Sequence, residues 1–201
     1  IWGHFTVLSG MVREGSLAIK IIRALEKFVS RRAAHLIVQT EAGREYFTER
    51  GVAAEDISIL PHWIDEKMFA AAEAGGREKL REQYGWRDKF VVLFAGNLGI
   101  VQGLDSVLEA ARQIPNGNAR IVFVGEGTDK PRLEKLAEDL KLGDKVQFVE
   151  RQPLERMPAF MSASDALLVS LKKSELTKFV VPSKTVAYLA SGKPILMATG
   201  G

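Results

Sequence analysis

The 201-residue sequence contains no cysteine. This absence excludes disulfides, thiolate zinc sites, iron–sulfur clusters and cysteine nucleophiles, and it is compatible with a reducing compartment. Histidine is also scarce, with 3 residues scattered along the chain. No G-x-S-x-G elbow, H-E-x-x-H pair or carboxylate dyad is present, so the familiar hydrolase and zinc-protease arrangements are not indicated.

Long apolar runs and charge of one sign are lacking as well. No stretch reaches the roughly 18 apolar residues that a membrane-spanning helix needs. Lys and Arg total 28 against 25 Asp and Glu, and the two signs are interspersed. This balance argues against a dedicated nucleic-acid-binding protein, and it allows a mild attraction to anionic membranes or phosphates. With 46% hydrophobic residues, the composition is that of a globular protein of one or two domains.

The two ends of the sequence indicate a part of a longer protein. The chain begins with Ile1 and ends with Gly200 and Gly201, where a helix would be expected to follow. A signal peptide therefore cannot be assessed from this sequence.

The first third of the chain predicts a small parallel α/β unit. Apolar residues at helical spacing predict a helix over 16–34, and the lysines and arginines lie largely between them. Strands are expected at 35–40 and 57–60, flanking a short helix that Thr40 caps. The basic helix has two interpretations, packing with a solvated face or contact with an anionic membrane.

The remainder alternates strands and helices. Residues 70–76 are small and weakly patterned, and are the expected interdomain connection. Strands are predicted at 90–95, 120–124, 146–149, 166–170 and 195–198, and helices at 77–84, 105–114, 157–162 and 183–191, with a further helix that Thr128 or Asp129 would cap. This rhythm predicts a doubly wound parallel sheet that binds ligands at the carboxyl ends of its strands.

Two glycine-rich turns follow predicted strands. Gly96, Gly99 and Gly103 follow the first, and Gly125 and Gly127 follow the second. Glycines at the start of a helix let a phosphate approach free N–H groups. Neither turn has P-loop spacing or the dinucleotide fingerprint. For each of the two turns, phosphate binding and a simple tight turn without a ligand therefore remain as interpretations.

Lys184 is the strongest single candidate. Pro182 and Ser183 open a predicted helix, which places Lys184 in the first turn. A cation there opposes the helix dipole, and a bound anion would offset that cost. We therefore interpret Lys184 as functional. The upstream lysines 172, 173 and 178 add local positive charge, and we interpret the first two as surface residues.

Taken together, these segments resemble a known family. Residues 34–41, 50–52 and 59–65, and then 92–99, 102–105, 123–127, 181–184 and 188–194, are similar in order and content to family 4 retaining glycosyltransferases with the GT-B fold. The similarity covers essentially the whole chain and is greatest to the WbuB-like branch, which makes bacterial surface polysaccharides.

The resemblance implies two Rossmann-like doubly wound domains, the first only partly present. Residues 1–70 would be the C-terminal part of the acceptor-side domain. Residues 71–201 would be the nucleotide-sugar-binding domain, incomplete at its C-terminus. It implies catalytic roles for Lys184 and Asn97, and donor binding by Gly96, Asn97, Gln102, Gly125, Gly127, Val149, Arg151, Pro182, Ser183 and Lys184.

One departure from the family concerns a pair of glutamates. Phe179 and Ala187 stand where many members have Glu, the second of which holds the ribose hydroxyls. Loss of that contact is expected to weaken donor binding by about 1–3 kcal/mol. Many members also have Arg at Asn97 and Lys at Gln102, although Asn and Gln are usual in the WbuB-like branch.

The implied activity is transfer of a hexosyl, N-acetylhexosaminyl or deoxyaminosugar group with retention. The donor would be a nucleotide-diphosphate sugar, a UDP-sugar, used without cofactor or metal. The acceptor would be a saccharide on a polyprenyl diphosphate, in lipopolysaccharide or related polysaccharide biosynthesis. The location would be cytoplasmic, as a peripheral protein at the inner face of the plasma membrane, with no nucleic-acid partner.

Two other functions remain as alternatives. One is a catalytically inactive GT-B homologue that binds or regulates, for which Ala187 is the main support. The other is a different phosphate-binding Rossmann enzyme, such as an epimerase, which the missing dinucleotide fingerprint disfavours.

Overall fold

A computed structural model describes residues 2–65, 67, 76–115, 118–174, 179 and 181–199. The predicted connection at 70–76 lies outside these residues except for Gly76, which begins a helix. The chain forms two compact units. The first comprises Ile1–Trp63 and Lys172–Val181, and the second comprises Ile64–Leu171 and Pro182–Thr199.

The first unit contains a two-stranded parallel sheet. Its elements are α1 (Trp2–Leu8), α2 (Leu17–Arg32), β1 (Leu36–Val38), α3 (Glu41–Thr48), η1 (Ala54–Asp56) and β2 (Ile57–Ile59). Leu36 pairs with Ile57, which confirms the predicted parallel pairing. Thr40 accepts a hydrogen bond from the Gly43 N–H at 3.1 Å, which confirms it as the cap of α3. The sequence did not predict α1.

Helix α2 has its predicted extent, and its apolar face is exposed. Leu17, Ile21, Leu25, Phe28 and Val29, which form its apolar face, are all more than half exposed. Ile19 and Ser30 are the buried residues of this helix instead. The described residues therefore leave this apolar face uncovered, and both interpretations of α2, packing and membrane contact, stay predictions.

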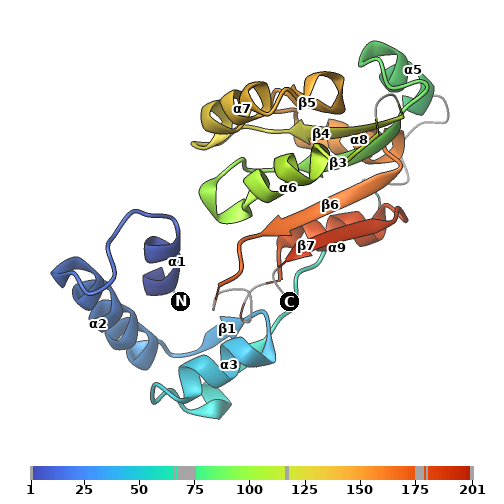
Figure 1. The fold of residues 1–201 in the computed structure, drawn as a ribbon. Coiled ribbons are helices and arrows are strands. Elements are labelled where there is room, and N and C mark those ends of the chain that lie inside the picture. The colour runs from blue at the N-terminus through green and yellow to red at the C-terminus, as the bar shows by residue number, and fades with distance from the viewer. Residues whose placement is uncertain are drawn as a thin grey trace. The chain divides into compact units, whose positions relative to one another are not determined.

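The second unit is a five-stranded parallel sheet in the order β5-β4-β3-β6-β7 (Figure 1). The strands are β3 (Phe90–Ala95), β4 (Ala119–Val124), β5 (Val146–Val149), β6 (Ala166–Leu171) and β7 (Ile195–Thr199). The helices are α5 (Gly76–Gln83), α6 (Leu104–Ala111), α7 (Lys130–Asp139), α8 (Met157–Ala163) and α9 (Ser183–Ala190). The predicted strands and helices are confirmed, with shifts of a few residues at their ends.

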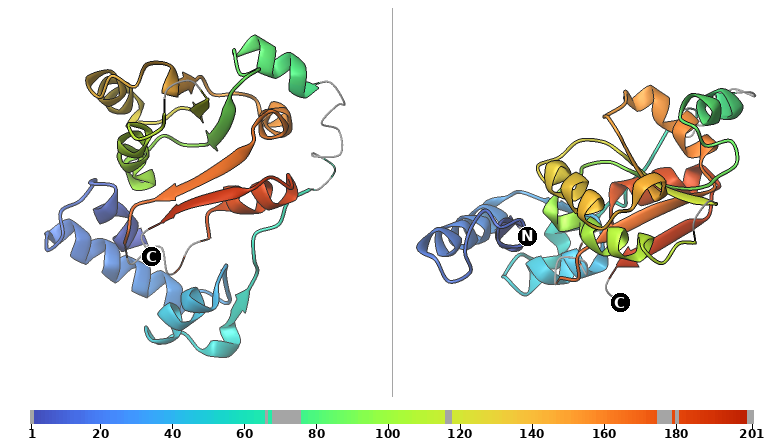
Figure 2. Two further views of the ribbon diagram at one scale, coloured as in Figure 1. Left: turned by 45° about the vertical axis from the view of Figure 1, so that its right-hand side comes forward. Right: turned by 45° about the horizontal axis from the view of Figure 1, so that its top comes forward.

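Helices cover both faces of this sheet, as Figure 2 shows. Val91, Leu93 and Ala95 of β3 pack with residues of α5, α8 and α9 on one face. Val92 and Phe94 pack with α6 and α7 on the other. Because successive side chains of a strand point to opposite faces, a strand covered on both sides is apolar throughout. This explains the uninterrupted apolar run of β3.

The predicted cap of α7 differs in detail. Asp129 occupies the N-cap position, but its side chain makes no capping hydrogen bond. Its carboxylate instead accepts two hydrogen bonds from Arg132, at 2.6 and 2.7 Å. An arginine one turn into the helix thus competes with the backbone N–H groups for the carboxylate.

An ion-pair network connects the amino ends of β3 and β6. Asp165 accepts hydrogen bonds from Arg77 at 2.8 Å, from Arg81 at 3.1 Å and from the Val91 N–H at 2.8 Å. These contacts hold the pKa of the Asp165 carboxyl below its usual value despite partial burial, which alone would raise it. The network fixes α5 to the sheet at the end opposite the predicted ligand site.

The sheet opens at its carboxyl end between β3 and β6. β3 pairs with β4 over six residues, but with β6 only at Val92–Ala166 and Leu93–Leu167. The strand order also reverses at this point, since β4 and β5 lie on one side of β3 and β6 and β7 on the other. In open α/β sheets, such a switch point forms a crevice where ligands bind.

Candidate functional site

The turn after β3 begins at the switch point. Gly96 has a φ of +140°, a conformation that favours glycine. Its N–H donates to the Val124 carbonyl of β4 at 2.9 Å. Further along the loop, the Gln102 carbonyl accepts a hydrogen bond from the Ser170 hydroxyl of β6 at 2.7 Å. The ends of β4 and β6 therefore both hold this loop, and they leave Gly96 and Asn97 exposed.

The turn after β4 packs directly on the turn after β3. A Cβ atom on Gly125 would lie 1.9 Å from the Gly96 carbonyl oxygen, and one on Gly127 would lie 2.2 Å from the Leu98 carbonyl oxygen. The Leu98 N–H also donates to the Glu126 carbonyl at 2.9 Å. Backbone approach between the two turns therefore requires both glycines, whether or not a ligand is present.

Two predicted residues lie at the end of β5 and just after it, one buried and one exposed. Val149 is buried, and its carbonyl accepts a hydrogen bond from the Gly125 N–H at 3.1 Å. Arg151 is exposed. The neighbouring Glu126, which sequence reasoning passed over, pairs with Lys130 at 2.8 Å, and that hydrogen bond is the main cause that lowers the pKa of its carboxyl.

Lys184 points from the first turn of α9 to the turn after β3. Its Nζ atom lies 3.5 Å from the centroid of the Phe94 ring and 3.0 Å from the position of a Cβ on Gly96. The Nζ atom is buried and has no hydrogen-bond partner among the residues that the structure describes. Burial lowers the pKa of this amine to about 7. The Phe94 ring attracts the ammonium but cannot accept its three protons as an anion would.

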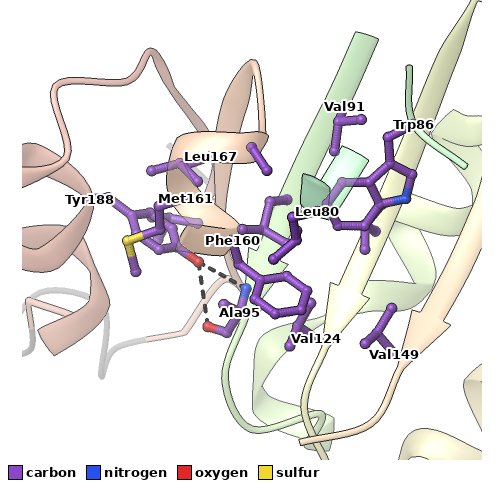
Figure 3. Close-up of a cluster of buried hydrophobic side chains, with 14 residues drawn as sticks. Leu80, Trp86, Val91, Ala95, Val124, Val149, Phe160, Met161, Leu167 and Tyr188 are labelled. Atoms are coloured by element: carbon purple, nitrogen blue, oxygen red, sulfur yellow. Dashed lines mark hydrogen bonds between the residues drawn. The ribbon is translucent and has the colours of Figure 1, made fainter. Parts of the chain in front are cut away.

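Tyr188 lies one turn after Lys184, and the sequence analysis did not single it out. Its hydroxyl accepts a hydrogen bond from the Ala95 N–H at 2.9 Å and donates one to the Ala95 carbonyl at 3.4 Å (Figure 3). Burial raises the pKa of this phenol to about 12, so it stays protonated at neutral pH. Its role depends on a contact with a residue 93 positions away, which no local sequence pattern indicates.

Other predicted residues have different surroundings. Pro182 occupies the N-cap position of α9 without a side-chain capping hydrogen bond, and Ser183, the first residue of the helix, is exposed. Lys178 lies outside the described residues. At the two glutamate positions, the Phe179 carbonyl accepts a hydrogen bond from the Thr40 hydroxyl at 3.1 Å within the first unit, and Ala187 packs against the core of the second. Neither position offers a carboxylate.

The described residues contain no group of three or more His, Asp or Glu side chains placed to hold a metal ion. Within the same ranges, no helix has the length and apolar character to cross a membrane. What the second unit offers is an unpartnered buried amine, the exposed residues Gly96 and Asn97, and the first turn of α9, all at the carboxyl end of a parallel sheet. This combination suits a polyanionic ligand such as a diphosphate.

Comparison with known sequences identifies a family and several relatives. The family described as "Glycosyl transferases group 1" matches residues 76–199. The putative colanic acid biosynthesis glycosyl transferase WcaI of Escherichia coli (strain K12) is 35% identical over 145 residues, which are 72% of this chain and 35% of that protein. The probable glycosyltransferase WbjE of Pseudomonas aeruginosa is 26% identical over 190 residues, or 94% of this chain and 47% of WbjE. The chain thus spans between a third and a half of these relatives.

Solved structures show the same architecture. HepE of Anabaena, crystallised with UDP and glucose, superposes with a TM-score of 0.76 at 21% identity, over 90% of this chain and 49% of HepE. WaaG, a glycosyltransferase involved in lipopolysaccharide biosynthesis, gives a TM-score of 0.76 at 20% identity, over 90% of this chain and 49% of WaaG. These likenesses confirm the predicted α/β fold of the GT-B type with Rossmann-like units.

Proposed function

We propose, since the chain belongs to the group 1 glycosyltransferase family, that its second unit binds a nucleotide-diphosphate sugar. The diphosphate would lie against Lys184 and the exposed residues Gly96 and Asn97. The observation that carries this proposal is the Lys184 ammonium, which is buried without a hydrogen-bond partner in the described chain. A buried amine without a partner lowers the stability of the folded protein, and ligand binding is a reason to retain it.

The chemistry follows from the charges. Breaking the bond from the sugar to the diphosphate leaves negative charge on the phosphate oxygens and positive charge on the sugar. Lys184 and N–H groups at the start of α9 would stabilise the leaving diphosphate, which is electrostatic catalysis. Asn97, in the turn after β3, would donate a hydrogen bond to the diphosphate, and Gln102 would support the diphosphate further along the same loop. In transfer with retention, a leaving phosphate oxygen can take the acceptor's proton.

The finer assignment rests on the resemblance and on the relatives. We propose a retaining enzyme of the WbuB-like branch that uses a UDP-sugar without a metal. The crystallised HepE complex with UDP and glucose supports the choice of nucleotide. The biosynthetic roles of WcaI and WaaG, in colanic acid and lipopolysaccharide, support a saccharide acceptor in a similar pathway. A polyprenyl-linked acceptor and membrane contact by α2 belong to the same proposal.

The division of labour between the units is proposed on the same grounds. Residues 1–70 would belong to the acceptor-side domain, and residues 71–201 would bind the donor. Val149 and Arg151 would lie beside the nucleotide base, and Gly125 and Gly127 beside the nucleoside. The diphosphate would lie at Pro182, Ser183 and Lys184.

Calorimetric titration of the full-length protein with UDP, GDP and ADP tests the proposal. We expect one of the three to bind, and Lys184→Met to weaken that binding by about ten- to a hundredfold, since a charge-assisted hydrogen bond contributes roughly 1.5–3 kcal/mol. Lys79→Met is the matched control, because Lys79 is an exposed lysine on α5. Absence of binding by all three nucleotides would contradict a donor-binding site.

A catalytically inactive homologue is the second candidate, and Ala187 is the observation that favours it. Ala187→Glu separates the two. A gain of sugar-transfer activity in the full-length protein, with tighter UDP binding, would identify an enzyme that tolerates the loss of the ribose contact. Nucleotide binding without transfer in either form would favour a binding or regulatory role.

A further inference from the structure

The opening between β3 and β6 leaves backbone groups of β3 without a strand partner. The Gly96 N–H donates to β4, and successive N–H groups of a strand point to opposite sides. The Ala95 N–H and carbonyl therefore face the β6 side. There the pairing of β3 with β6 has already ended at Leu93. Buried backbone groups need partners, so the fold must supply one from elsewhere.

Tyr188 supplies that partner with a single hydroxyl. It accepts from the Ala95 N–H and donates to the Ala95 carbonyl, so it serves both groups of one residue (Figure 3). Its side chain is fully buried and packs in the same cluster as Leu93 and Leu167. These two bonds are the direct polar connection that the described residues provide between α9 and β3.

Tyr188 and Lys184 are four residues apart in α9, so they lie on the same face of the helix. That face contacts three successive residues of the chain. Lys184 lies over the Phe94 ring and beside Gly96, and Tyr188 bonds to Ala95 between them. A shift or tilt of α9 that broke the Tyr188 bonds would therefore also move the Lys184 amine away from the turn.

We infer that Tyr188 is a positioning residue, whose paired bonds to Ala95 set the place of α9 on β3 and so hold the Lys184 amine against the Gly96 turn. The ligand-binding part of this inference rests on the proposed function. The placement of Lys184 does not, since it is a property of the protein without ligand.

The first test measures Lys184 directly in the absence of nucleotide. Competitive labelling with acetic anhydride, read by mass spectrometry over pH 5–10, gives the titration midpoint of each lysine. Burial is the cause that lowers the pKa of Lys184 to about 7. The Tyr188 phenol, with a pKa of about 12, does not titrate in this range. The midpoint therefore reports how closely the amine is packed.

In Tyr188→Phe we expect the midpoint of Lys184 to rise by about one unit or more towards 10.5, because water reaches the amine when α9 loosens. The matched control is Tyr84→Phe, which removes a hydroxyl from a ring stacked on Trp86 in the same unit. A lower Tm with an unchanged Lys184 midpoint in Tyr188→Phe would show a merely structural role and overturn the inference.

The second test adds the ligand. In Tyr188→Phe the Kd for UDP, measured at pH 7 in the full-length protein, should rise by about tenfold, while Tyr84→Phe leaves it unchanged. In a Lys184→Met background the effect of Tyr188→Phe should largely disappear, because Tyr188 acts through Lys184. If Tyr188→Phe raised the Kd equally in the parent protein and in Lys184→Met, the inference that Tyr188 acts through Lys184 would be overturned. If the parent protein binds no nucleotide, the proposed function fails, while the labelling test still decides the role of Tyr188.

A measurement on the unaltered protein covers the case in which Tyr188→Phe does not fold. Hydrogen exchange of the Ala95 amide reports the opening of its bond to Tyr188. Acetylation of Lys184 reports exposure of the amine. Each measurement gives an equilibrium constant for local opening. If Tyr188 holds Lys184 in place, the constant from the Ala95 amide should equal the constant from the Lys184 amine. Lys184 labelling through openings far more frequent than those of the Ala95 amide would overturn the inference.

Discussion

The binding of UDP should take up a proton at Lys184. In the free protein the pKa of this amine is about 7, lowered from 10.5 by burial. A diphosphate in hydrogen-bond contact favours the charged amine and raises that pKa again. Binding is therefore strongest at pH values where Lys184 is already protonated, and it weakens as the pH rises through 7.

The size of the effect follows from the titration curve. About half of the Lys184 side chains are charged at pH 7 and about 1% at pH 9, so the apparent association constant should fall by up to about fiftyfold between these values. The terminal phosphate of UDP, with a pKa of about 6, is already ionised throughout this range. At pH 8 up to about 0.9 proton should be taken up for each UDP bound.

Isothermal titration calorimetry in buffers of different ionisation enthalpy measures both quantities. Lys184→Met should bind weakly with little dependence on pH between 7 and 9, and Lys79→Met should behave as the parent protein. UDP binding that is equally tight at pH 7 and pH 9, without proton uptake, would refute the assignment of Lys184 as the buried group that meets the diphosphate.

Three further predictions concern stability, each measured by urea unfolding. The pKa of Lys184 is lower in the folded than in the unfolded protein, so the destabilisation from this residue grows as the pH falls from 10.5 to 7, to at most about 5 kcal/mol. Lys184→Met should therefore stabilise the protein at pH 7 and barely at pH 10.5. Equal free energies of unfolding for Lys184→Met and the parent protein at pH 7 would contradict this. Gly125→Ala should destabilise by about 3 kcal/mol or more, since its Cβ would lie 1.9 Å from the Gly96 oxygen, whereas the control Gly143→Ala, with φ +50° and open space around it, should lose only about 1 kcal/mol. Asp165→Asn should destabilise by about 3–5 kcal/mol at pH 7, because it leaves Arg77 and Arg81 without their carboxylate; in the parent protein this stabilisation is present above pH 3.8 and lost as the pH falls below it.

The sequence predicted the alternating elements of the second unit because each one is locally consistent. β3 is apolar throughout because helices cover both of its faces, and Thr40 and Gly103 mark helix starts by local geometry. Lys184 was identified by an electrostatic argument that needs only its place in the first turn of α9. The structure adds that its amine is also buried beside Phe94.

What the sequence did not predict depends on contacts between distant segments. The pairing of Tyr188 with Ala95 joins residues 93 positions apart, and no local pattern marks it. The reason for Gly125 also lies in another turn, at Gly96. For α2 the helical pattern predicted the helix, but an apolar face does not identify the surface that covers it, and the described residues leave this one exposed.

The contrast between Gly125 and Lys184 has a consequence for the divergence of such proteins. Gly125 serves the fold itself, so selection for stability alone retains it. Lys184 lowers the stability of the fold, so if it binds the diphosphate as proposed, a copy that no longer binds the anion gains stability from many apolar substitutions there. In a lineage that loses nucleotide binding, residue 184 should change early and the glycines late. Under that proposal, intact glycine turns would indicate shared ancestry alone, whereas a retained lysine at position 184 would indicate that the protein still binds its anion.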